Sequence, residues 1–206
     1  MLPESAPVID ALRALEDGNA RFVAGTPERP HQDAAYRASL AAGQHPFAVV
    51  FGCSDSRVSA ELLFDQGFGD LFVIRTAGHV ADDAVTASIE FAVDHLGVSA
   101  LVVLGHEDCG AVGACVADID GASPLPGRLP ILIERIRPHL EAGAVGSTSD
   151  DHSAHVRAGV HAHVRCSVED ILRDSAIVRR AHAAGKLQVA GAVYSLASGE
   201  VTLTDH

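Results

Sequence analysis

The sequence predicts an α/β fold: a mostly parallel central sheet flanked by helices, with a C-terminal antiparallel edge strand. Three observations favour it. Short apolar runs recur along the chain, helical stretches lie between them, and the runs are apolar at every position rather than at alternate ones. Continuous apolarity is typical of strands covered on both faces, and alternation of strand with helix is typical of parallel pairing.

The four predicted parallel strands are apolar runs that are too short to be helices. They are FAVVFG at 47–52, LFVIR at 71–75, ALVVLG at 100–105 and LQVAGAV at 187–193. The segment 201–204 follows a turn at Ser198 and Gly199 closely enough to pair antiparallel with the fourth strand.

Apolar residues at helical spacing, or a high alanine content, predict helices over 7–24, 34–42, 82–96 and 152–183. Pro7 suits a first turn, and Asn19 interrupts the apolar stripe of the first helix. Asp82 or Asp83 can cap the third helix, and Gly97 can end it. Residues 141–151 are the candidate for a mobile stretch. We expect a single domain over 1–206, with a helical arm of about 7–42 and an α/β core of about 43–206.

Composition excludes several classes of function. Fifteen basic residues against 27 acidic ones give a net charge of -12, which repels nucleic acid and anionic lipid. No apolar run reaches the roughly 20 residues of a membrane helix, and the N-terminus lacks the features of a signal peptide. We therefore expect a soluble cytoplasmic protein. Four cysteines in this context indicate metal binding or catalysis rather than a disulfide framework.

Two clusters of reactive side chains directly follow predicted strands. Cys53, Asp55 and Arg57 follow the first strand, and His106 and Cys109 follow the third. Ligands collect at the carboxyl ends of parallel strands, so adjacent strands would bring two thiolates and one imidazole around a single ion. Three protein ligands leave one tetrahedral position free, as in catalytic zinc sites, and thiolates favour zinc over magnesium or calcium.

Local spacing supports both halves of this site. Cys109 opens a predicted helix, whose dipole and free N–H groups favour the thiolate that a metal needs. Asp55 and Arg57 are two residues apart, which lets the guanidinium hold the carboxylate through paired hydrogen bonds.

The motifs resemble those of β-class carbonic anhydrases over most of the chain. The matching blocks are GNARFVAG (18–25), GQHPFAVVFGCSDSRV (43–58), DQGFGDLFVIRTAGHV (65–80), SIEFAV (88–93) and VVLGHEDCGAV (102–112). The resemblance implies zinc-dependent, reversible hydration of carbon dioxide to bicarbonate and a proton, by attack of zinc-bound hydroxide. It also implies an obligate homodimer that can pair into tetramers, with the N-terminal helix packed on the partner.

The resemblance also implies roles for individual residues. Gln44 and the backbone N–H of Gly110 fall where the family holds substrate, and Phe72, Ala77 and Phe91 fall where it lines an apolar pocket. Asp55 is implied in catalysis while Arg57 holds it. Released from Arg57, Asp55 would bind zinc itself and close the site.

Alternative functions remain at this point. The same scaffold could hydrolyse carbon disulfide or carbonyl sulfide, or could bind zinc and bicarbonate without catalysis. A thiol redox protein would need a C-x-x-C pair, which the sequence lacks. Cys115 and Cys166 are interpreted as small apolar core residues.

Seven further histidines invite other interpretations. We interpret His152, His155, His161 and His163 as a solvated surface rather than a second metal site. As an alternative, one of these or of His31, His45 and His79 relays protons from the site.

Overall fold

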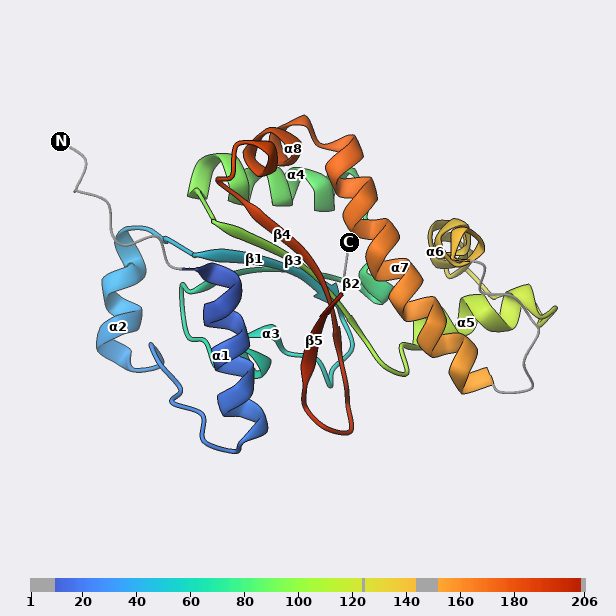
Figure 1. Cartoon of the computed structure of the whole chain (residues 1–206), viewed down its shortest axis with the longest axis horizontal. Coiled ribbons are helices and arrows are strands. Elements are labelled where there is room, and N and C mark those ends of the chain that lie inside the picture. Colours follow the sequence, from blue (N-terminus) through green and yellow to red (C-terminus); the bar gives the residue numbers. More distant parts are fainter. Residues whose placement is uncertain (1–9, 124, 144–151, 205–206) are drawn as a thin grey trace.

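The computed structural model describes residues 10–123, 125–143 and 152–204, and has a five-stranded sheet at its centre (Figure 1). The strand order is β2-β1-β3-β4-β5. β1 pairs in parallel with β2 and β3, β3 pairs in parallel with β4, and β4 pairs antiparallel with β5. The bounds are β1 (Ala48–Cys53), β2 (Leu71–Thr76), β3 (Ala100–His106), β4 (Gln188–Tyr194) and β5 (Val201–Thr204). The predicted fold class is confirmed.

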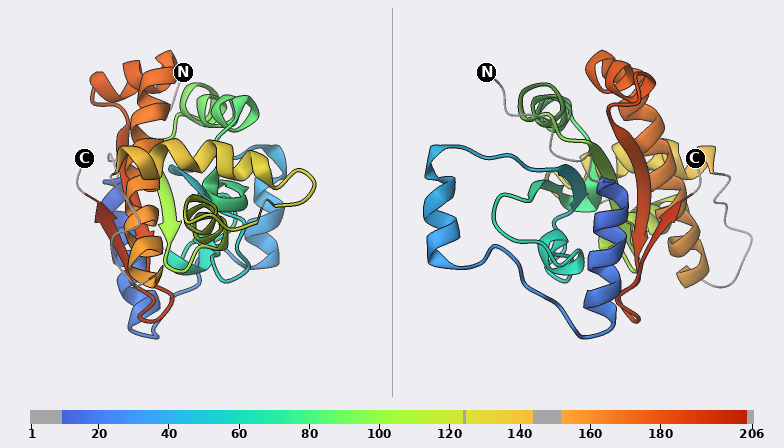
Figure 2. Two further views of the ribbon diagram at one scale, coloured as in Figure 1. Left: turned by 90° about the vertical axis from the view of Figure 1, so that its right-hand side faces the viewer. Right: turned by 60° about the vertical axis from the view of Figure 1, so that its left-hand side comes forward.

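Helices cover both faces of this sheet (Figures 1 and 2). Alternate strand residues such as Phe51 and Val50 therefore belong to two different hydrophobic clusters, one on each face. The larger cluster is completed by α4 (Asp83–Phe91), α5 (Gly110–Ile119), α6 (Pro130–Ala142), α7 (His152–Asp174) and α8 (Ala176–Ala183). The smaller one is completed by α1 (Ala11–Val23) and α3 (Ala60–Leu63). This double cover explains why the strands are apolar at every position.

Capping side chains set the helix boundaries. Asp82 caps α4 by accepting a hydrogen bond from the Val85 N–H at 2.9 Å, and a π-helical turn, η3 (Ala92–Leu96), continues α4 to Gly97 at φ +69°. The predicted helix over 152–183 is in fact two helices. The hydroxyl of Ser175 accepts from the Val178 N–H at 3.1 Å and thereby starts α8.

The N-terminal arm is fastened to the core by polar side chains at its base. α1 starts after Asp10, so the predicted first turn at Pro7 lies outside the described residues. Asn19 is buried. Its amide donates to the carbonyls of Leu63 and Gly199, each at 3.0 Å, and these hydrogen bonds replace those that it would make with water. Its position in the apolar stripe of α1 is thus explained by hydrogen bonds.

Beyond α1 the arm leaves the sheet. α2 (Ala34–Ser39) and the 3-10 turn η1 (Leu40–Ala42) lie on a loop that projects away from the rest of the chain (Figure 2). The described part of α2 buries none of its residues. This arm therefore presents surface that its own chain does not cover.

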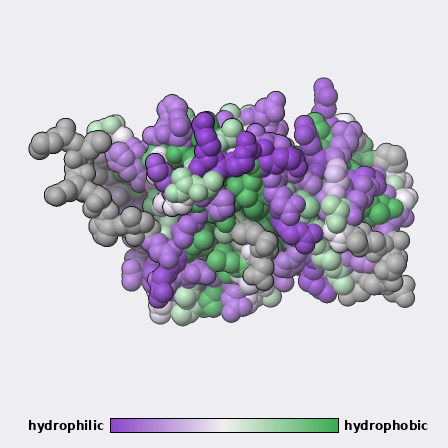
Figure 3. Space-filling view, turned by 45° about the horizontal axis from the view of Figure 1, so that its top comes forward, coloured by the Kyte–Doolittle hydropathy of each residue, from purple (hydrophilic) through white to green (hydrophobic). Residues whose placement is uncertain are grey.

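The surface is mixed in character. On the face seen in Figure 3, hydrophobic residues show between hydrophilic ones rather than as one continuous apolar surface. Within the described ranges, no helix combines the length and apolarity needed to cross a membrane.

Candidate metal centre and active site

The candidate site lies where two neighbouring strands end. β1 ends at Cys53 and β3 ends at His106, and the two strands pair in parallel up to Gly52 and Leu104. After β1 the chain runs to α3 on one face of the sheet, and after β3 it enters α5 on the other. This divergence makes the β1/β3 boundary a topological switch point, where ligands bind in open α/β sheets.

Cys53, His106 and Cys109 meet at this boundary. One ligand atom from each lies within 4.8 Å of the other two, and all three residues are buried. The Nδ1 of His106 donates to the Glu107 carbonyl at 2.8 Å, which leaves Nε2 buried and without a hydrogen-bond partner in the described part of the chain. An unpaired imidazole nitrogen beside two sulfurs fits a soft divalent metal ion.

The pKa values of the two thiols also support binding of a divalent metal ion. The Cys109 thiol, together with His106 and the N–H groups of Asp55 and Gly78, lowers the pKa of Cys53. The nearby Cys53 and burial raise the pKa of Cys109. A divalent ion would balance the charge of two thiolates held this close together.

Asp55 is held beside this cluster by Arg57. Its Oδ1 accepts from the Arg57 backbone N–H and from Nε, each at 2.9 Å, and its Oδ2 accepts from the guanidinium at 2.7 Å. The Arg57 side chain holds the pKa of Asp55 well below its usual range. Asp55 Oδ2 lies 3.9 Å from His106 Nε2, so the ionised carboxylate faces the candidate ligands. Arg57 also donates to the Asp108 carbonyl at 3.3 Å, which ties the two loops together.

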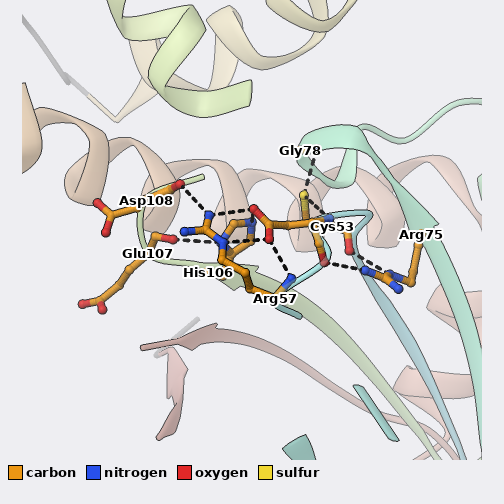
Figure 4. Close-up of polar contacts among 8 residues, drawn as sticks. Cys53, Arg57, Arg75, Gly78, His106, Glu107 and Asp108 are labelled. Atoms are coloured by element: carbon orange, nitrogen blue, oxygen red, sulfur yellow. Dashed lines mark hydrogen bonds and ion pairs between the residues drawn. The ribbon is translucent and has the colours of Figure 1, made fainter. Parts of the chain in front are cut away.

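Two residues on the neighbouring strand and turn complete the site, and sequence reasoning missed their roles. Arg75 of β2 donates to the carbonyls of Cys53 at 2.9 Å and Asp55 at 2.7 Å, and the Gly78 N–H donates to Cys53 Sγ at 3.3 Å (Figure 4). The position of Arg75 near the end of a predicted strand was an available signal. The contacts with main-chain atoms were not readable from sequence.

Two of the residues predicted to bind substrate lie at the cluster. Ala77 directly follows Thr76, whose register partner is Cys53, and it opens the 3-10 turn η2 (Ala77–His79). Gly110 begins α5 directly after Cys109. Their roles in binding substrate stay predictions.

Gln44, Phe72 and Phe91 lie elsewhere. Gln44 precedes β1 and so lies beyond its amino end, whereas Cys53 lies at its carboxyl end. Phe72 pairs with Val49 of β1. Val49 precedes Cys53 by four residues, which is roughly 13 Å along the strand at about 3.3 Å per residue. The ring of Phe91 lies 6.2 Å from that of Phe72. One chain does not bring these three residues to its own Cys53, and their roles stay predictions.

The remaining cysteines and histidines form no second cluster of this kind among the residues that the structure describes. Cys115 and Cys166 are buried, and burial raises the pKa of each thiol. His163 was predicted to lie on a solvated surface, but it is 1% exposed, so that interpretation was wrong for this residue. It contacts the turn at Gly78 and His139 of α6.

Comparison with known proteins identifies the family. The family model for carbonic anhydrase matches residues 48–201. The chain is 46% identical to the carbonic anhydrase of Mycolicibacterium smegmatis, covering 100% of this chain and 97% of that one. It is 45% identical to carbonic anhydrase 2 of Mycobacterium tuberculosis, covering 100% and 96%.

Solved structures agree. A structure from a report on two tetrameric β-carbonic anhydrases of Sordaria macrospora superposes with a TM-score of 0.74 at 26% identity, covering 95% of this chain and 96% of that one. The chain therefore belongs to the β-carbonic anhydrase family of enzymes.

Gly78 allows a direct test of how tightly the turn beside Cys53 is packed. It adopts φ +62°, and an added Cβ would lie 2.7 Å from the Cβ of Ala111. We expect Gly78→Ala to lower the free energy of unfolding by about 2 to 4 kcal/mol, from backbone strain plus overpacking. Chemical denaturation at one protein concentration measures this.

Gly185→Ala is the matched control, because Gly185 has φ +67° with no neighbouring atom within 4 Å. It should show the backbone strain alone, about 1 to 2 kcal/mol. Equal losses of unfolding free energy in the two variants would mean that the turn at Gly78 accommodates the added Cβ without overpacking.

Proposed function

We propose that this chain catalyses the zinc-dependent, reversible hydration of carbon dioxide to bicarbonate and a proton. The observation that carries the proposal is the buried Cys53, His106 and Cys109 cluster, with the Asp55 carboxylate 3.9 Å from the free nitrogen of His106. Hydration of carbon dioxide is also the general reaction of the family to which the chain belongs. When bound, zinc acts as a Lewis acid that makes hydroxide available near neutral pH.

Two thiolates and one imidazole would hold the zinc. The Glu107 carbonyl fixes the His106 tautomer, so that Nε2 presents its lone pair to the metal. The N–H groups of Asp55 and Gly78 stabilise the Cys53 thiolate. These contacts support a site that is arranged before metal binding.

Asp55 would orient the attacking hydroxyl. Its Oδ1 accepts two hydrogen bonds from Arg57, whereas Oδ2 accepts one and keeps acceptor capacity on the side of His106. Oδ2 could therefore accept a hydrogen bond from the attacking hydroxide and orient its lone pair toward the carbon of carbon dioxide. By holding the Asp55 carboxylate, Arg57 would keep it from binding the metal and closing the site. The intact pair favours catalysis over the non-catalytic alternative.

A second copy of the chain would complete the substrate pocket, in a cytoplasmic homodimer or tetramer. β2 is an edge strand of the described sheet, and Leu62, Phe68 and Phe91 nearby are 61%, 50% and 44% exposed. Large exposed apolar side chains of this kind indicate a protein interface. The roles proposed for Gln44, Phe72 and Phe91, with Ala77 and Gly110 of the other copy, are then those of a shared site. Two relatives from Sordaria macrospora are described as tetrameric.

The central test is stopped-flow measurement of carbon dioxide hydration at pH 8.5, with zinc-loaded protein and with protein stripped by a chelator. We expect catalysis that is lost on stripping and restored by zinc. Cys109→Ser should lose zinc and activity together, whereas Cys115→Ser, at a buried thiol outside the cluster, should retain both.

No acceleration by zinc-loaded protein would favour the non-catalytic alternative. Hydrolysis of carbonyl sulfide or carbon disulfide without hydration of carbon dioxide would favour the other hydrolase.

Arg57→Ala tests the proposed role of the ion pair. We expect kcat to fall roughly 100-fold, because an oriented acceptor in the transition state is lost. A crystal structure of the zinc-loaded variant should show Asp55 bound to the metal. Arg180→Ala, at an exposed arginine of α8, is the control. A kcat for Arg57→Ala within twofold of this control would refute the role.

Mixing two inactive variants tests the shared site. In a dimer of Cys53→Ser with Gln44→Ala, one of the two sites keeps both its metal ligands and the glutamine of the other chain. Random exchange should therefore restore roughly one quarter of wild-type activity. Cys53→Ser mixed with Cys109→Ser is the control, and should restore none. Activity of the first mixture no higher than the mean of its parents would mean that Gln44 does not act across subunits.

A further inference from the structure

A chain of hydrogen bonds runs from α7 and α6 to the turn beside the candidate metal centre. His163 of α7 is buried, and its Nε2 lies 2.8 Å from the Gly78 carbonyl oxygen. Its Nδ1 lies 2.7 Å from Nδ1 of His139 on α6. The Nε2 of His139 in turn lies 2.9 Å from Oδ2 of Asp170.

The partners at the two ends determine where the protons lie. A carbonyl oxygen only accepts, so His163 carries its proton on Nε2 and accepts on Nδ1 from His139. His139 also faces the carboxylate of Asp170, an acceptor, and therefore donates from both nitrogens. Burial, with the positive charge of His139, lowers the pKa of His163 to about 4, which agrees with a neutral ring. The donor of His163 is thus directed at Gly78.

Packing keeps the His163 ring in this orientation. The ring of His79 stacks on it with centroids 4.1 Å apart and an interplanar angle of 28°. His79 is itself fully buried, and it packs edge-on against Phe51. A rotation of the His163 ring would break its hydrogen bonds and disturb this packing.

Gly78 links these histidines to the metal centre. Its N–H donates to Cys53 Sγ at 3.3 Å, and its carbonyl accepts from His163. The residue adopts the left-handed region at φ +62° and ψ 26°, within a turn whose next residue, His79, has φ +40°. The two hydrogen bonds therefore orient the peptide groups on either side of a glycine in the left-handed region, next to His79, which as a non-glycine residue is strained there.

We propose that His163, oriented by His139 and Asp170, is a positioning residue for the metal centre. By holding the Gly78 carbonyl, it aims the Gly78 N–H at the Cys53 sulfur and so stabilises the metal-binding thiolate. This inference rests on the proposed function, in that Cys53 must bind the metal. The competing interpretation is a core histidine whose hydrogen bonds only satisfy its own buried nitrogens.

The test measures the metal centre rather than activity. Zinc affinity is determined by competition with a chromophoric chelator, and the thiolate-to-cobalt charge-transfer band is recorded after substitution with Co²⁺. For His163→Leu we expect about 10-fold weaker zinc binding, as is typical when a partner of a metal ligand is lost. The band should move to longer wavelength, because a sulfur without its N–H donor gives up electron density more readily.

Two further variants separate the hydrogen bond from the packing. His163→Gln can still donate an amide N–H to Gly78, and should bind zinc within about threefold of the wild type, since most of the effect in His163→Leu is the lost donor. His161→Leu, at an exposed histidine of the same helix, should leave affinity and band unchanged.

The outcomes are distinct. Unchanged affinity and band in a folded His163→Leu variant overturn the inference, and so does a His163→Gln variant that loses as much affinity as His163→Leu. If His163→Leu does not fold, His139→Leu replaces it, with the same direction of change expected and no change overturning the inference. Failure of the wild type to bind zinc or Co²⁺ would instead reject the proposed function.

Discussion

The parallel pairing of β1 with β3 is the constraint on which the site depends. It brings Cys53 close to His106, and the loop after β3 then returns Cys109 to the same place. Because the chain leaves these strands toward opposite faces of the sheet, the space beyond their ends stays open to a ligand. Both strands are fully buried, so this boundary is anchored in the hydrophobic core.

Hydrogen bonds that involve main-chain atoms position the loops around the candidate metal ligands. Arg75 holds the carbonyls of Cys53 and Asp55, Arg57 reaches the Asp108 carbonyl, and the Gly78 N–H contacts the Cys53 sulfur. Directed hydrogen bonds of this kind hold charge in a buried site without large rearrangement on ligand binding. These hydrogen bonds thus join the three loops after β1, β2 and β3 into one polar network at the carboxyl ends of an apolar sheet.

Some elements were not predicted, each for a different reason. α3 has only four residues, and α6 was not identified although Pro130 opens it and Ile133, Ile136 and Leu140 are buried at helical spacing. The break between α7 and α8 arises where Ser175, besides capping α8, also donates to Glu90. Such a contact joins residues far apart in sequence, which periodicity does not detect.

The sequence by itself determined the strands, through their continuous apolarity, and the residue types at their carboxyl ends. These residues follow their strands directly, so local order alone placed Cys53, Asp55, Arg57, His106 and Cys109 at one edge of the sheet. Only the tertiary structure decided that the ring of Phe91 lies 6.2 Å from that of Phe72, and that His163 is buried against Gly78. Strand register and helix packing set these distances, and both are cooperative properties of the whole core rather than of any one segment.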